Sequence, residues 1–229
     1  MKKLAIIIFG APGSGKSTQA ELIAKKFNLI HFNTGKFLED IVFDPKRQKE
    51  KIVQREKKLF VEGKLLTPSF VTKELKKILM RINKAGWGIV FSGSPRTLYE
   101  AQKIIPLLKK LYSKENIIFF DLKIKEKDVY QRNSARLICK ICGYALLSKY
   151  VPLKNPKHCP VCAGPFYKRV LDNPEKIKIR LLEYKNRTEP IFDFVKKQGF
   201  KIHNLDGKKA PYQIFEKISL IIQKNLKNK

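Results

Sequence analysis

The chain has 229 residues, 43% of them hydrophobic, which is enough for one sizeable core with a small inserted subdomain. This hydrophobic content, with no low-complexity run, excludes an intrinsically disordered protein. The formal net charge of +29 suggests a nucleic-acid partner, but lysines occur in every segment rather than in one stripe interleaved with aromatic residues. We therefore do not expect nucleic acid as the main partner.

The first residues, MKKLAIIIFGA, have the basic start and apolar run of a signal peptide. The run is short, however, and GAPGSGKST follows at once where a cleavage region would be needed. No later segment approaches the roughly 20 apolar residues of a membrane span. We expect a cytoplasmic protein with no membrane partner, in a compartment that keeps cysteines reduced.

A phosphate-binding loop follows the first predicted strand. Residues 3–9 form a continuous apolar run and residues 17–27 have helical spacing, and between them GAPGSGKS fits the pattern GxxxxGK[ST]. In this context backbone N–H groups surround phosphate oxygens, Lys16 reaches the β and γ phosphates, and Ser17 can ligate Mg²⁺. The predicted nucleoside triphosphate site comprises Gly10, Gly13, Ser14, Gly15, Lys16, Ser17 and Thr18.

Strands and helices alternate along most of the chain. Apolar runs of the same kind recur at residues 88–92, 116–124 and 199–205. Amphipathic segments at 68–85 and 98–112 lie between them, which predicts an α/β fold with a parallel sheet covered on both faces. Two segments interrupt the alternation: residues 34–70 are helical and charged, and residues 138–168 have no helical period. We interpret both as insertions on the core.

Four cysteines form two CxxC pairs in the second insertion, Cys139 with Cys142 and Cys159 with Cys162. Two such pairs are the usual way to bring four thiolates to tetrahedral positions around Zn²⁺. A zinc ion held in this way is structural, because four thiolates leave no open position for water. Two disulfides or unligated buried thiols are the alternative, which a reducing compartment disfavours.

Arginine is scarce, with nine arginines against 40 lysines, so each arginine is a candidate for a position that requires a planar, bidentate cation. Arg96 follows a predicted strand, at the edge of the sheet where ligands of open α/β sheets bind. Arg132 and Arg136 are four residues apart and are predicted to share one face of the helix that leads into the cysteine segment. Arg169 leaves that segment, and Arg180 lies on the helix after it.

These motifs together resemble one enzyme family. GAPGSGKSTQA, NTGKFLE, EGKLLT, PRT, the Arg-x3-Arg pair, the CxxC insertion and RLLEYKNRTEPIFDFVKKQG are similar, in order and spacing, to a long-type adenylate kinase with a zinc-holding lid. The resemblance implies a P-loop kinase core with a five-stranded parallel sheet flanked by helices. It assigns residues 1–33, 71–136 and 171–229 to the core, 34–70 to a helical insertion that binds a nucleoside monophosphate, and 137–170 to a zinc-binding lid.

The resemblance also implies an activity: reversible, Mg-dependent phosphoryl transfer from ATP to AMP, giving two ADP, by a monomer. It assigns catalysis to Lys16, Arg96, Arg132, Arg136, Arg169 and Arg180, of which Arg132 and Arg136 also contact ATP. It places the acceptor monophosphate against Thr34, Gly35, Lys36, Leu65, Leu66, Gly93, Arg96 and Glu100. Zinc would fix the shape of a lid that has too few apolar residues for its own core and that moves as one body.

Three departures concern the donor side. Ser92 stands where the family motif DGFPRT has an Asp that helps to hold the waters around Mg²⁺, and Ser94 stands where it has Phe. Behind Arg169 the family has two Asp residues, and here Leu171 replaces one of them, leaving Asp172. The first change affects the metal, and the last affects hydrogen bonding of the lid.

Two further departures concern the acceptor. Glu39 stands where the family's TGDxLR ends in an Arg that pairs with the monophosphate, and Lys36, one helical turn earlier, is a possible replacement cation. Glu100 stands at the position of the Gln that reads adenine. A carboxylate only accepts hydrogen bonds, which suits the two donors of guanine, so GMP is an alternative acceptor. In the other interpretation Glu100 lies in solvent and Gln102 reads adenine.

Three functions remain at this point. The first is an active nucleoside monophosphate kinase with AMP, GMP or another monophosphate as acceptor. The second is a catalytically weakened nucleotide-binding paralogue, which Ser92 and Glu39 favour. The third is a nucleic-acid-binding protein that uses its charge and zinc element, which a steep salt dependence of binding would support.

Overall fold

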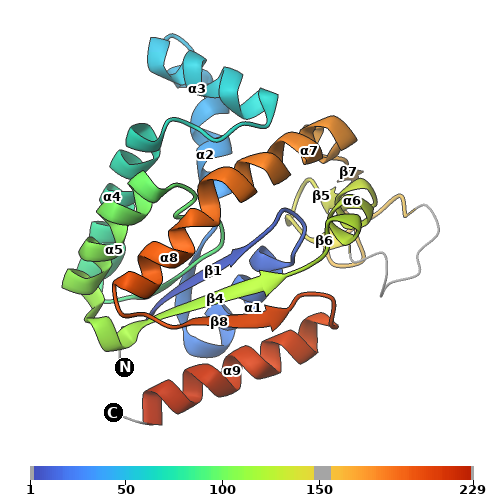
Figure 1. Cartoon of the computed structure of the whole chain (residues 1–229). Helices are drawn as coiled ribbons and strands as arrows, with labels where there is room; N and C mark the ends of the chain where they lie inside the picture. The colour runs from blue at the N-terminus through green and yellow to red at the C-terminus, as the bar shows by residue number, and fades with distance from the viewer. Residues whose placement is uncertain (1–2, 147–155, 228–229) are drawn as a thin grey trace.

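A five-stranded parallel sheet forms the centre of the molecule. The computed structural model describes residues 3–146 and 156–227, and the order of the strands in the sheet is β2-β3-β1-β4-β8 (Figure 1). Every residue of the central strand β1 is buried, which explains its continuous apolar sequence. The strands are β1 (Ala5–Gly10), β2 (Leu29–Phe32), β3 (Gly88–Phe91), β4 (Ile117–Lys123) and β8 (Ile202–Asp206).

Helices connect the strands and cover the sheet. They are α1 (Lys16–Phe27), α2 (Thr34–Phe43), α3 (Lys51–Glu62), α4 (Pro68–Lys84), α5 (Leu98–Tyr112), α6 (Glu126–Ser134), α7 (Pro174–Glu183), α8 (Pro190–Lys197) and α9 (Pro211–Lys227). Three short 3-10 turns lie at Pro45–Arg47, Lys114–Asn116 and Val170–Asp172, and a π-helical turn, Tyr184–Thr188, joins α7 to α8.

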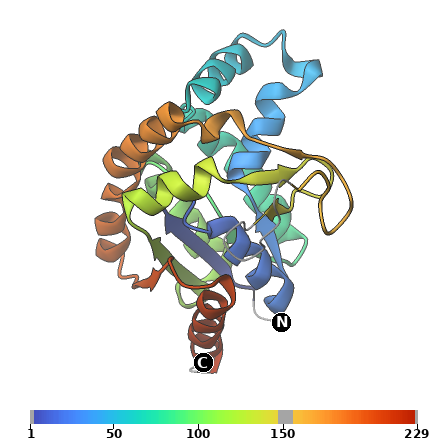
Figure 2. The same cartoon turned by 90° about the vertical axis from the view of Figure 1, so that its right-hand side faces the viewer.

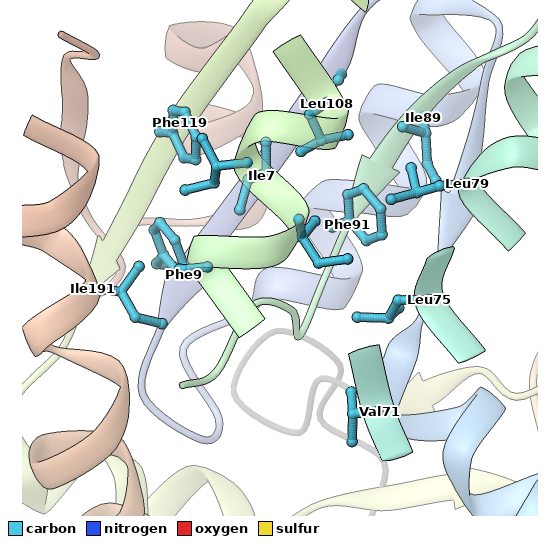
Figure 3. Close-up of a cluster of buried hydrophobic side chains, with 14 of the residues drawn as sticks. Ile7, Phe9, Val71, Leu75, Leu79, Ile89, Phe91, Leu108, Phe119 and Ile191 are labelled. Atoms are coloured by element: carbon cyan, nitrogen blue, oxygen red, sulfur yellow. The ribbon is translucent and has the colours of Figure 1, made fainter. Parts of the chain in front are cut away.

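The core consists of two apolar layers, one on each face of the sheet. Ile7 of β1 lies in register with Phe91 and Phe119, and these side chains pack against α4, α5 and α8 (Figure 3). The alternate residue Ile6 belongs to the layer on the other face, with residues of α1 and with Ile218 of α9. The alternation follows from strand geometry, in which successive side chains point to opposite faces. Figure 1 shows α9 and α5 on opposite sides of the sheet.

A second, small sheet follows α6. Its strands β5 (Leu137–Cys139), β6 (Ala145–Leu146) and β7 (Phe166–Tyr167) pair antiparallel in the order β6-β5-β7 (Figure 2). The predicted lid spans this sheet, although residues 147–155 of the lid lie outside the described residues.

The predicted α/β class, the parallel sheet and the four strands read from apolar runs are confirmed. Residues 34–70 are helical, as predicted. The apolar pattern missed β2, because this edge strand has four residues of which only Leu29 is buried. It also missed β5, β6 and β7, which are two or three residues long.

Within residues 3–146 and 156–227, no helix combines the length and the hydropathy needed to cross a membrane.

Candidate active site

One cavity of about 1130 Å³ opens where β1 and β3 end, the edge at which open α/β sheets bind ligands. Thr34 does not line it; its hydroxyl is buried with no hydrogen-bond partner among the described residues. The predicted residues that line the cavity are Gly10, Gly13, Ser14, Gly15, Lys16, Ser17, Thr18, Gly35, Lys36, Leu65, Leu66, Gly93, Arg96, Glu100, Arg132, Arg136, Arg169 and Arg180.

The loop between β1 and α1 has the shape of a phosphate cradle. Gly13 and Gly15 adopt positive φ angles of 77° and 95°, which glycine adopts without steric cost, and α1 begins at Lys16. A Cβ atom on Gly13 would lie 2.4 Å from Nδ2 of Asn133, so no other side chain fits there. Arg132 approaches the same loop, with Nη1 3.4 Å from the carbonyl oxygen of Gly13. The loop therefore presents a helix N-terminus and two cations to one space.

Lys16 folds back over this loop. Its Nζ donates to the carbonyl oxygens of Gly10 and Ala11 at 2.7 and 2.8 Å. Burial lowers the pKa of Lys16 well below its ordinary value, and three neighbouring guanidinium groups lower it further, in the order Arg96, Arg180 and Arg136. Because the neighbours are cations, a bound anion would restore the pKa of Lys16. The cavity therefore concentrates positive charge around Lys16.

Asp172 holds two of the predicted arginines. Arg136 donates to both carboxylate oxygens of Asp172, with Nε 2.9 Å from Oδ2, and Nη1 of Arg180 lies 3.5 Å from Oδ1. The prediction that Arg136 shares a helix face with Arg132 is wrong. Helix α6 ends at Ser134, because the chain turns there into β5, and Arg136 lies beyond the helix and reaches Asp172. Both arginines still line the cavity.

Arg169 and Lys36 each have a carboxylate partner on α2. Nη2 of Arg169 lies 3.8 Å from Oε2 of Glu39, and Nζ of Lys36 lies 2.7 Å from Oδ1 of Asp40. Lys36 is therefore not paired with Glu39, which it was expected to compensate.

Glu100 is buried at the start of α5, where it caps the helix. Its two oxygens accept hydrogen bonds from the backbone N–H of Arg96 and the hydroxyl of Thr97, each at 3.0 Å. Thr97 is the N-cap residue of α5, and its hydroxyl oxygen accepts from the backbone N–H of Glu100. The interpretation that Glu100 lies in solvent is wrong, since its exposed fraction is 2%. Gln102 is exposed and does not line the cavity.

The four cysteines form a cluster beside the small sheet, and two of them, Cys139 and Cys142, also line the cavity. Their Sγ atoms all lie within 4.8 Å of one another, and none is in a disulfide. The two CxxC turns have the same backbone geometry: the N–H of Gly143 donates to the carbonyl of Cys139, and that of Ala163 donates to the carbonyl of Cys159. Four sulfur atoms gathered in this way could together hold one metal ion.

A family model for adenylate kinase matches residues 8–200 of the chain. The chain belongs to the adenylate kinase family. It is 34% identical over 219 residues to the adenylate kinase of Methanothrix thermoacetophila, with 96% of this chain and 98% of that protein covered. It is 32% identical to the adenylate kinase of Elusimicrobium minutum, with 96% and 99% covered, and 31% identical to that of Enterococcus faecalis, with the same coverage. The chain is a phosphotransferase of the nucleoside monophosphate kinase type.

In this member of the adenylate kinase family, Ser92 is part of a short polar chain beside the phosphate loop. Its Oγ lies 2.7 Å from Nε2 of His31 and 3.4 Å from Oγ of Ser17. Burial lowers the pKa of His31, so the imidazole favours its neutral form. His31 was not predicted as a site neighbour, because it lies on the strand that the apolar pattern missed.

Sequence reasoning also missed a pair of polar side chains near Lys16, the buried Asp121 and the half-buried Tyr184. The Tyr184 hydroxyl lies 3.5 Å from Oδ1 of Asp121, and Asp121 is close enough to Lys16 to raise the pKa of its ammonium group. Tyr184 begins the π-helical turn, a distortion that often marks functional sites. The same turn places the hydroxyl of Thr188 2.9 Å from the carbonyl of Arg96. A polar residue within the otherwise apolar run IIFFDLK was the available signal for Asp121.

Proposed function

We propose that the chain catalyses reversible, Mg-dependent transfer of the terminal phosphoryl group of ATP to AMP, giving two ADP. The observation that carries this proposal is the convergence of Lys16 and five arginines on one cavity beside a phosphate loop. Such a set of cations suits phosphoryl transfer, which requires positioning and charge stabilisation and little acid–base chemistry.

The donor side is the phosphate loop. The N–H groups at the start of α1 would bind the phosphate oxygens of ATP, and Lys16 would exchange its carbonyl partners for the β and γ phosphates. Arg132 lies at the same loop and would neutralise the same phosphates. These groups would hold the donor so that the acceptor can approach in line.

The remaining arginines would surround the phosphoryl group in transit. Arg96 is half-buried, with Nε 2.6 Å from the carbonyl of Gly93, and its Nη2 lies beside Gly35 at the start of α2, where the acceptor phosphate would be. Arg136, Arg169 and Arg180 would stabilise the charge spread over the equatorial oxygens. Their present carboxylate partners are Asp172 and Glu39. A phosphate would take over these contacts, because Arg binds both groups with the same bidentate geometry.

Ser17 is the residue that would hold Mg²⁺. Ser17 lines the cavity at the head of α1, and its hydroxyl contact with Ser92 is long at 3.4 Å, so the hydroxyl can turn toward a metal. Mg²⁺ bound with ATP usually takes few protein ligands and keeps several waters, which fits a single hydroxyl. When bound, the ion would neutralise charge between the phosphates.

The cysteine cluster would hold a structural zinc ion. Zn–S bonds of 2.3 Å in a tetrahedron place sulfur atoms about 3.8 Å apart. The Sγ atoms of Cys139 and Cys162 are 3.4 Å apart, and those of Cys142 and Cys159 are 3.6 Å apart, close to that value and far from a disulfide bond. Backbone N–H groups of Ile141 and Val161 point at two of the sulfurs and favour thiolates. Reduced thiols also support a cytoplasmic location.

We further propose three functional parts within one monomer. Residues 1–33, 71–136 and 171–229 would form the core, 34–70 the acceptor-binding insertion, and 137–170 the lid. We propose that the monomer is the active form. Closure of the lid would exclude water, which otherwise competes as acceptor.

AMP is the proposed acceptor, and GMP is the alternative. The capping role of Glu100 supports AMP, because both carboxylate oxygens are already used at the start of α5. Of the predicted acceptor residues, those that line the cavity and would contact the monophosphate are Gly35, Lys36, Leu65, Leu66, Gly93, Arg96 and Glu100.

A coupled assay with ATP, Mg²⁺ and each nucleoside monophosphate in turn tests the function. We expect the highest kcat/KM with AMP, and an AMP/GMP ratio that Glu100→Gln leaves within about threefold. A change of ten-fold or more would show that Glu100 reads the base. If ATP binds but no monophosphate accepts a phosphoryl group, the chain is a weakened nucleotide-binding paralogue.

A further inference from the structure

One ion pair joins the two segments that flank the cavity. Glu39 lies on α2 of the insertion, and Arg169 follows β7 at the end of the small sheet. Nη2 of Arg169 and Oε2 of Glu39 are 3.8 Å apart, and the exposed fractions of the two side chains are 20% and 24%. The contact is therefore only partly solvated, and both residues line the cavity.

Arg169 is the cation that forms an ion pair with Glu39, whereas Lys36 acts on Glu39 only through its charge at longer range. Lys36, which could have neutralised Glu39, forms a 2.7 Å pair with Asp40, and both of these side chains are more than half exposed. Arg136 and Arg180 share Asp172, so they have their own carboxylate. Among the described residues, Glu39 is thus the carboxylate that forms an ion pair with Arg169.

We infer that Glu39 is a positioning residue that holds Arg169 in the empty site and competes with substrate phosphate for it. The inference rests on the proposed function of this site. A phosphate carries more charge than a carboxylate and can bind Arg bidentately, whereas the Glu39 contact is a single long one, so phosphate displaces it. Since the pair breaks before chemistry, Glu39 weakens substrate binding and leaves the transition state unaffected.

A second consequence concerns the ligand-free protein. Because the pair joins α2 to the segment after β7, it holds the insertion and the base of the lid together before substrate binds. Salt should weaken this contact, since screening acts on partly exposed charges. High ionic strength and loss of the carboxylate should therefore have the same effect on the empty protein.

Glu39→Gln tests the inference, with Glu50→Gln as the matched control. Glu50 lies just before α3 in the same insertion, and it pairs at 2.8 Å with Arg47 away from the cavity. We expect Glu39→Gln to lower KM for AMP about two- to five-fold with kcat unchanged, because a partly exposed pair contributes little more than this. The gain should shrink as salt is raised. Glu50→Gln should leave both constants unchanged.

Hydrogen–deuterium exchange of the ligand-free proteins provides a readout that does not depend on catalysis. We expect faster exchange in residues 34–43 and 166–172 of Glu39→Gln than of the parent or of Glu50→Gln, and the same increase in the parent at high salt. If KM for AMP is unchanged or rises, if kcat falls, or if exchange is unaltered, the inference is wrong. If the parent transfers phosphate to no monophosphate, the proposed function fails. In that case ATP affinity, measured by calorimetry, is compared between the parent and Glu39→Gln in place of KM, together with the exchange rates.

Discussion

Replacing Asp172 with Asn should destabilise the empty protein and strengthen nucleotide binding. The Asp172 side chain is 3% exposed and contacts two guanidinium groups that are themselves about one-fifth exposed. The change removes the negative charge and keeps the size and one acceptor oxygen. Arg136 and Arg180 would then lie close together without a counter-ion.

The magnitude follows from burial. Removing one partner of a fully buried ion pair costs about 3–5 kcal/mol, because a charge is left unpaired. The arginines here retain some solvent, and the Asn oxygen still accepts one hydrogen bond, so we expect a loss of about 2–3 kcal/mol. For a chain of this size, this corresponds to a fall in Tm of about 4–12 °C. Burial, followed by Arg169, Arg136 and Arg96, already lowers the pKa of Arg180, which Asp172 opposes.

Thermal unfolding with and without saturating ATP distinguishes this cause from a general loss of packing. Phosphate would replace the missing carboxylate, so ATP should raise Tm more in Asp172→Asn than in the parent, and ATP affinity by calorimetry should increase. Asp193→Asn is the control, because Asp193 forms an exposed pair with Lys196, and we expect little change from it. An equal loss of Tm with and without ATP, or weaker ATP binding, would refute the reasoning.

Three other predictions concern the lid, the metal and pH. Arg136→Lys should lower kcat about a hundredfold and change ATP affinity little, because an ammonium group cannot form the bidentate contact that is made in the transition state. Steady-state kinetics would measure kcat, and calorimetry would measure ATP affinity. An unchanged kcat would remove Arg136 from the site. The parent should contain one zinc ion per chain, which metal analysis can check. Cys142→Ser should lower Tm without abolishing ATP binding, which calorimetry can check. Four thiols that all titrate in a metal-free native protein would contradict this prediction. Burial lowers the pKa of His31 in the folded protein. As pH falls through about 6.5, the unfolded chain therefore binds a proton at this histidine before the folded protein does. The free energy of unfolding should decrease below that pH by at most about 1.4 kcal/mol per pH unit. His31→Gln should flatten the dependence of Tm on pH between 7 and 5, and an unaltered slope would show that another group is responsible.

Local sequence predicted the parts of the fold and site that local chemistry determines. The glycines and Lys16 of the phosphate loop are adjacent in sequence, and the buried strands have apolar runs, so both could be read directly. The cysteine cluster was predictable for a related reason, because CxxC spacing fixes each half of the cluster. β2 could not be read in this way, since a short edge strand with one buried residue has no distinctive pattern.

Contacts between distant segments were not predictable from pattern. Arg136 was placed on a helix by its spacing from Arg132, yet its position is decided by Asp172, 36 residues later. Lys36 was considered as a replacement for the Arg that Glu39 displaces, but the ion-pair partner of Glu39 is Arg169, which follows β7, 130 residues later. The sequence showed only that a carboxylate stands in place of a cation, and the arrangement in space showed which cation that carboxylate contacts.

The partners of the site cations divide into two kinds, and this division indicates how the cavity fills. Lys16, Arg132 and Arg96 rest on backbone carbonyls, which have no net charge to repel an entering phosphate. Arg136 and Arg169 rest on carboxylates that a phosphate must displace, and Arg180 contacts both the Asp172 carboxylate and, at 3.2 Å, the carbonyl oxygen of Leu171. The carbonyl-bound end can therefore accept phosphate with no loss of an ion pair. The carboxylate-bound end exchanges one anion for another, so an entering phosphate meets less uncompensated positive charge there.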